Sequence, residues 1–197
     1  TADEPAGERG VAMVAGYGLQ PYAASANDLI ELGMTGGDFR TDVTSDHTTF
    51  SVTGLAVYLD QLLGGLNMIA RNGDYDDLHE LARRERAAHR IDAPHLAADL
   101  SWSFALYGYD HPYARGGVWQ EIDKAATDAR AVRAFRQAYY QPDDATLIIA
   151  GGFDPALAER WIEHELGDWY GHGAPGTTLP ARMLPLAYAT PEASSLL

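Results

Sequence analysis

The stretch that bears most directly on the fold is AVRAFRQAYYQPDDATLIIAGGFDP, at residues 131–155. Its first part has apolar residues at helical spacing, at Val132, Phe135 and Tyr139, which predicts a helix with one apolar face. Its centre, ATLIIA at residues 145–150, is a continuous apolar run between polar residues and glycines, a pattern typical of a well-buried strand. The stretch therefore predicts a helix followed by a strand within one packed core.

Signals at the ends of these elements extend the prediction in both directions. Thr127 is a suitable N-cap for the first helix, which we expect to run to Tyr140. Asp154 followed by Pro155 is typical of the start of a helix, and Gly167 is typical of its end. We therefore expect a second helix that begins after the strand and ends directly before this glycine.

A hairpin is predicted by DFRTDVTSDHTTFSVTG at residues 38–54. Apolar residues recur there among threonines and polar residues, as two strands joined by a turn near Ser45-Asp46 require. The apolar positions are Phe39, Val43, Phe50 and Val52.

Other parts of the chain have mainly helical patterns. The apolar run GVAMVAGY at residues 10–17 is short enough to be either a helix or a strand. Several arginines in the segment 74–90 indicate a solvated helix face rather than a binding patch. The segments that we expect to be helical are 25–33, 55–71, 74–90 and 95–107.

These elements together predict an α+β domain, with helices packed on one face of a mainly antiparallel sheet. The predicted sheet has only three strands, which is small for 197 residues. We therefore expect first strands that precede residue 1 and are missing from the chain. The domain should occupy residues 1–170, and the Gly-, Pro- and Thr-rich residues 171–197 should form a linker or tail.

Composition argues against several classes of function. A formal charge of -14 repels phosphate backbones, so we expect no nucleic-acid partner. No apolar stretch is long enough to span a membrane, and no signal-peptide pattern opens the chain, so no membrane association is expected. The chain has no cysteine, so any bound metal would depend on histidine and carboxylate ligands.

No complete catalytic motif can be identified from the residues alone. Nucleophile-elbow and phosphate-loop motifs are absent from the sequence. Glu85 and His89 have the i, i+4 spacing that places two ligands on one helix face, and His95 follows nearby. Arginines crowd that helix, however, and positive charge opposes the binding of a dication. The spacing favours a metal site and the arginines oppose it, so a relocated metal site at Glu85, His89 and His95 is only an alternative hypothesis.

Several blocks of sequence follow one another in a specific order: ALYGYDHPYARGG at residues 105–117, AVRAFRQAYYQPDDATLIIAGGFDP at 131–155 and ELGDWY at 165–170. This order resembles the insulinase or pitrilysin family of zinc metallopeptidases, which includes mitochondrial processing peptidase. A His-Pro-Tyr loop, a helix ending in Tyr, an apolar strand, a Phe-Asp-Pro turn and a Gly-Asp-Trp stop follow one another as in that family. The resemblance implies the fold of one half-domain of such a peptidase. The blocks are residues 36–39, 46–50, 105–117, 131–155 and 165–170.

The chain departs from this family where the family holds its zinc. The resemblance places Met13, Gly16 and Tyr17 where the family has its His-x-x-Glu-His ligands and base. A thioether, a hydrogen atom and a phenol cannot replace two imidazoles and a carboxylate. The family's third ligand falls near Ala87, with Glu85 as the nearest acid. We therefore expect no catalytic residue and no cofactor in this chain, although the family uses zinc.

The resemblance implies that this chain functions together with a second half of the same fold. Family members pair two halves of this fold across a cavity, so an inactive half would bind peptide substrates together with a catalytic half or subunit. The edge strand with Phe39, Arg40, Thr41 and Asp42 would then contact substrate by strand addition. One alternative is a stand-alone peptide-binding or scaffold domain, and another is a metalloenzyme with the relocated site. The compartment stays open, although the frequent export of bacterial relatives favours the periplasm.

Overall fold

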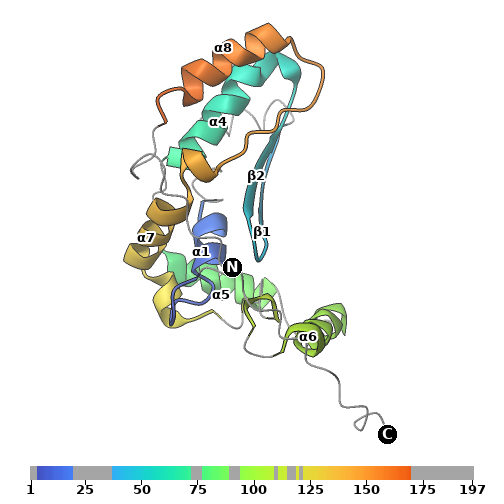
Figure 1. The fold of residues 1–197 in the computed structure, drawn as a ribbon, viewed down its shortest axis with the longest axis vertical. Coiled ribbons are helices and arrows are strands. Elements are labelled where there is room, and N and C mark those ends of the chain that lie inside the picture. The colour runs from blue at the N-terminus through green and yellow to red at the C-terminus, as the bar shows by residue number, and fades with distance from the viewer. Residues whose placement is uncertain are drawn as a thin grey trace, which may run out of the picture.

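The computed structural model describes residues 4–19, 37–71, 77–88, 94–108, 111–114, 119 and 122–169. Figure 1 shows helix α8 lying along α4 at one end of the molecule, with the hairpin β1–β2 beside them. Helix α1 packs near α7 and α5 in the middle, and α6 lies toward the other end. In chain order the elements are α1 (Val11–Tyr17), β1 (Asp38–Val43), β2 (Thr48–Thr53), η1 (Ala56–Tyr58), α4 (Leu59–Arg71), α5 (Leu78–Ala88), α6 (Pro94–Tyr107), η2 (Pro112–Ala114), η4 (Lys124–Thr127), α7 (Ala129–Tyr139), η5 (Pro142–Asp144) and α8 (Pro155–Leu166).

The apolar run whose structure the sequence left open is helix α1. Val11, Ala12, Val14 and Ala15 are fully buried. The helix has no Ser, Thr, Asp or Asn at its N-cap, and the carboxylate of Glu4 takes that role by accepting hydrogen bonds from the backbone N–H groups of Gly10 and Ala12. These two bonds are 2.9 and 3.1 Å long.

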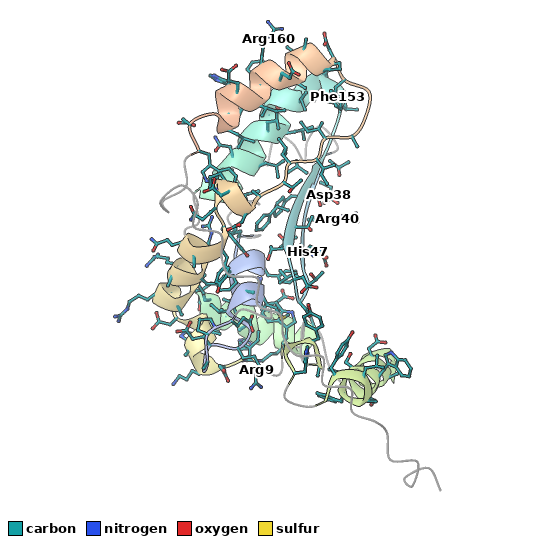
Figure 2. All side chains as sticks on the ribbon, in the orientation of Figure 1. Arg9, Asp38, Arg40, His47, Phe153 and Arg160 are labelled. Atoms are coloured by element: carbon teal, nitrogen blue, oxygen red, sulfur yellow. The ribbon has the colours of Figure 1, made fainter. Side chains whose placement is uncertain are left out.

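A distant segment of the chain fixes the approach to α1. The backbone N–H of Arg9 donates to Oδ2 of Asp123 at 2.9 Å, and the N–H of Asp123 donates to the carbonyl of Arg9, also at 2.9 Å. Figure 2 shows Arg9 close to α1 and α5, on the side away from α8. This reciprocal pair attaches the start of the chain to the segment that leads into α7.

The predicted hairpin is confirmed. Strands β1 and β2 pair antiparallel, with a register that runs from Asp38 opposite Thr53 to Val43 opposite Thr48. Alternate residues are more buried, which places one face of the hairpin against α1 and α4 and leaves the other in solvent. The expected α+β class, with helices on one face of an antiparallel sheet, is therefore confirmed.

Two apolar clusters form the core of the described residues. The larger cluster joins α1, α5 and α7 and includes Ile69 of α4. The smaller cluster lies where α4 meets α8, with Leu59, Leu63 and Ala158 buried at its centre. Ile149, Phe153, Trp161 and Ile162 pack around this second cluster.

Helix α8 begins as predicted, and the cap of helix α7 lies one residue later than predicted. Asp154 accepts hydrogen bonds from Ala156 N and Leu157 N, so it caps α8. Asp128, and not Thr127, caps α7 by accepting a hydrogen bond from the next turn. The hydroxyl of Thr127 is buried, where it donates to a backbone carbonyl of η4 and lies 2.7 Å from His79 Nδ1.

The prediction of a buried strand at residues 145–150 is wrong. The segment is not part of a sheet, and the sheet of the described residues has two strands, not three. Ile148 is 82% exposed and Leu147 is 40% exposed. The physical reason is that a strand forms only beside another strand, and no described strand pairs with this segment.

Several other expectations concern helices, and the structure tests part of them. Helices α4 and α5 lie within the predicted segments 55–71 and 74–90, and helix α6 begins one residue before the predicted segment 95–107. The predicted helix at 25–33 and the tail at 171–197 lie outside the described residues. Among the described helices, none has the length and apolar character needed to cross a membrane.

Candidate functional site

The face of α1 that the resemblance assigns to zinc is filled by packing. Met13 is 6% exposed and belongs to the larger apolar cluster. Gly16 is buried, and a Cβ atom added there would lie 2.6 Å from Cγ2 of Val43 and 3.3 Å from Cγ2 of Thr41. A glutamate at position 16 therefore has no room in this structure.

Tyr17 occupies the remaining position of this face. Its ring lies 5.5 Å from the ring of Trp119, at a tilt of 58°. Burial raises the pKa of Tyr17, and the negative charges of Asp42 and Glu85 raise it further, while a hydrogen bond with the backbone of Val43 acts in the opposite direction. The phenol is therefore held in its neutral form, and two carboxylates lie within electrostatic range of it.

Helix α5 supplies Glu85, an acid within electrostatic range of Tyr17. Its buried residues are Leu78, Leu81 and Ala82, and Glu85 continues the same face because it follows Leu78 by two turns. Ala87, near which the sequence placed the third ligand, is exposed to solvent. Glu85, which the sequence identified only as the closest acid, is thus the residue of this helix that faces the site.

These residues do not fit a zinc ion. The donors that α1 offers are a thioether and a phenol, and Gly16 offers none. Within the described part of the chain, no group of three or more His, Cys, Asp or Glu side chains is placed to hold a metal. The relocated site stays untested, because His89 lies outside the described residues and the side chain of His95 is not described.

The predicted substrate strand is β1, and its residues divide between two faces. Phe39 stacks with Phe50, at 6.4 Å between ring centroids, and Thr41 is buried beside α1. Arg40 and Asp42 are exposed. Figure 2 shows Arg40 and Asp38 on the same edge of the hairpin, and Arg40 Nε binds Asp38 Oδ2 at 2.6 Å.

Two features near this site were missed by reading the sequence. Trp119 packs against Tyr17, although no spacing in the sequence links the two residues. Arg86, assigned with its neighbours to a solvated face, donates to the carbonyls of Trp119 and Ile122 at 3.0 and 3.1 Å. The other arginines of the described part of α5, Arg83 and Arg84, are exposed as expected.

Comparison with known proteins agrees with the resemblance. Residues 127–194 match the family model described as the peptidase M16 inactive domain. Over residues 127–194, the chain is therefore similar to the M16 inactive peptidase domain. No curated protein sequence matches the chain.

A solved structure has the same fold as this chain. The crystal structure of a protease from Helicobacter pylori superposes with a TM-score of 0.74 at 14% sequence identity. The match covers 91% of this chain and 45% of that protease, so the chain spans less than half of its length. At this identity the likeness establishes the fold, and the expected half-domain architecture is confirmed.

Proposed function

We propose that this M16-type domain is a non-catalytic half that pairs with a catalytic half or subunit of the same family and helps to bind peptide substrates for proteolysis. The observation that carries the proposal is the packing of Gly16 against Val43 and Thr41, which leaves no space for a catalytic glutamate. The core around α1 is nevertheless intact. An intact fold with a filled catalytic face is what a supporting half requires.

Strand β1 is the part of the domain that we propose for peptide contact. In the two-stranded sheet of the described residues, β1 pairs with β2 on one side, and its other edge pairs with no described strand. An extended peptide can add to such an edge through backbone hydrogen bonds. Arg40 and Asp42 are placed to contact its side chains, whereas Phe39 and Thr41 support the strand from the packed face.

Co-expression tests the proposed pairing. The chain would be produced alone and together with a His-x-x-Glu-His-bearing family member from the same source, and cleavage of internally quenched peptides would be measured. We expect no cleavage by the chain alone and a stable, active complex with the partner. A partner that is fully active alone and does not co-purify with the chain would contradict the pairing.

A charge reversal tests the peptide contact. We expect Arg40→Asp to weaken peptide binding by the complex about tenfold, because it removes a charged contact at the strand edge. Arg83→Asp is the matched control, because Arg83 is also exposed and also bound to a neighbouring acid, Glu80. Equal titration curves for the two variants would leave β1 with a purely structural role.

The same experiments decide the alternative of a stand-alone binding domain. Peptide binding by the chain alone, with the affinity that the complex shows, would favour that alternative. The periplasm is our proposal for the compartment, and fractionation of the source cells with an antibody against the chain would test it.

A further inference from the structure

A tyrosine connects η2, the short helix that follows α6, to the turn of the hairpin. The hydroxyl of Tyr113 in η2 donates to Oδ1 of Asp46 at 2.5 Å, and Asp46 lies in the turn between β1 and β2. Figure 2 shows His47, the next residue, at the end of the hairpin that lies toward α6. The two bonded residues are 67 positions apart in the sequence, so this contact helps to fix the hairpin turn relative to α6 and η2.

The position of Tyr113 depends on His111, which caps η2. The backbone N–H of Tyr113 donates to Nδ1 of His111 at 3.2 Å, and the N–H of Ala114 donates to the carbonyl of His111 at 3.0 Å. This is the arrangement of an N-cap, in which a side-chain acceptor satisfies a free N–H of the first turn. The cap requires a lone pair on Nδ1, so it forms with the neutral imidazole that carries its proton on Nε2.

Ring contacts hold the imidazole of His111 in place. It stacks with the ring of Tyr107, at the end of α6, with 5.3 Å between ring centroids and 25° between ring planes. The ring of Tyr113 meets His111 edge-on at 5.1 Å and Tyr107 edge-on at 5.5 Å. Because a cation over the face of a tyrosine ring is attracted to it, a protonated imidazole keeps its place on Tyr107. The N–H of Tyr113 is therefore the group that has to move when His111 gains a proton.

The titratable groups around His111 come from three elements. Helix α6 contributes Tyr107, η2 contributes Tyr113, and the hairpin turn contributes Asp46 and His47. Within the described residues, His111 forms no ion pair with an acid. Between about pH 5 and 8 histidine is the side chain that ordinarily titrates, whereas carboxylates titrate below this range and tyrosines above it. His111 and His47 are therefore the two members of this set that change charge in that range.

We propose that protonation of His111 opens the contact between η2 and the hairpin turn, so that the chain responds to mild acidification. A proton on Nδ1 occupies the lone pair that the N–H of Tyr113 uses, and two donors then face each other. Loss of the cap displaces Tyr113 and removes its hydroxyl from Asp46, and α6 with η2 separates from the hairpin. The change involves no peptide and no partner, so the inference goes beyond the proposed function and does not depend on it.

Förster resonance energy transfer within the full chain tests the proposal. The sequence has no cysteine, so Thr49→Cys on β2 and Ala105→Cys on α6, both at exposed positions, provide two specific labelling sites. We expect higher transfer efficiency at about pH 8 than at about pH 5, with a transition that fits a single proton. The equilibrium constant for closing the contact should fall at least about tenfold at the lower pH, because a hydrogen bond is replaced by two opposed donors.

Variants of the labelled chain identify the proton that matters. His111→Asn keeps a cap acceptor that does not gain a proton, so transfer efficiency should stay high at both pH values. Tyr113→Phe lacks the hydroxyl that binds Asp46, so transfer efficiency should already be low at the higher pH. His47→Asn is the matched control, because Nδ1 of His47 also lies close to a partner, 3.1 Å from Oγ1 of Thr44. This control should keep the transition of the parent chain.

Four results would overturn the proposal, provided that circular dichroism shows each variant to be folded. They are equal transfer at both pH values in the parent chain, a transition that persists in His111→Asn, one that keeps its full amplitude in Tyr113→Phe, and one that disappears in His47→Asn. Peptide binding and cleavage enter none of these measurements. Failure of this proposal is therefore distinguishable from failure of the proposed function.

Discussion

Helix α1 and the segment 145–150 are both short apolar runs, but their environments differ. Val11 and Val14 of α1 are fully buried, whereas Ile148 of the segment is 82% exposed. Helix α1 is enclosed by α5, α7 and β1, whereas the described neighbours of the segment lie on the side of Ile149. Apolar composition therefore shows that a segment can be buried, but the elements packed against it determine whether it is buried.

The largest expected effect comes from Gly16→Glu, which places a carboxylate against Val43 in the enclosed region. We expect the free energy of unfolding to fall by about 4 kcal/mol or more, because the side chain has no room and its charge would be buried. Gly152→Glu is the matched control next to the open segment, where an added Cβ meets nothing within 4 Å, and should change stability by less than about 0.5 kcal/mol. Urea unfolding measures the stability of both variants, and equal losses of stability would contradict the difference between the two regions.

Replacing one isoleucine by alanine in each region tests the same difference in burial. Ile69→Ala removes a fully buried side chain from the larger cluster and should cost about 2–5 kcal/mol. Ile148→Ala removes an exposed side chain and should cost less than about 0.5 kcal/mol in the isolated chain. Thermal unfolding of both variants is the measurement, and a large loss in Ile148→Ala would show that this segment is already covered.

Loss of a helix cap is a smaller change that compares the two ends of the molecule. Asp154→Ala removes the cap of α8 and Asp128→Ala removes the cap of α7, and each should cost about 1 kcal/mol. Asn at either position should restore most of the stability, because its side chain also accepts hydrogen bonds from the first turn. Chemical denaturation measures these differences, and an alanine variant as stable as the parent chain would show that the cap contributes nothing.

Alkaline pH tests the burial of Tyr17 and has the smallest expected effect. Because burial raises its pKa, the folded chain keeps the phenol proton after the unfolded chain has lost it. The free energy of unfolding should therefore fall as pH rises above about 10, through the raised pKa of Tyr17. Tyr17→Phe should make this fall shallower. The pKa of Tyr140 is also raised by burial, so the double variant with Tyr140→Phe should flatten it further.

Much of the fold could be predicted because its signals are local. The Asp154-Pro155 start of α8, the threonine-rich hairpin and the helical spacing of α7 each depend on a few neighbouring residues. The strand predicted at 145–150 depended instead on a partner far away in sequence, about which the segment itself carries no information. The cap of α7 was placed one residue early because Thr127 and Asp128 are both suitable cap residues.

The candidate site was likewise predictable only where it depends on local spacing. The i, i+4 spacing of Met13 and Tyr17 was sufficient to place both on one face of α1. Counting along the chain to the third position gave Ala87, but a difference of two residues on a helix turns the side chain to the opposite face. The structure places Glu85 toward Tyr17 because Leu78, Leu81 and Ala82 fix the rotation of α5. The assignment of β1 to substrate binding remains a prediction.

The paired hydrogen bonds between Arg9 and Asp123 have a consequence for biosynthesis. A ribosome adds residues in order, so the start of the chain is translated long before the aspartate that holds it. Until then, the apolar residues of α1 emerge without their anchor and offer a binding site to chaperones. Nascent chains that stall before residue 123 should therefore be sensitive to added protease at α1, and longer ones should become resistant.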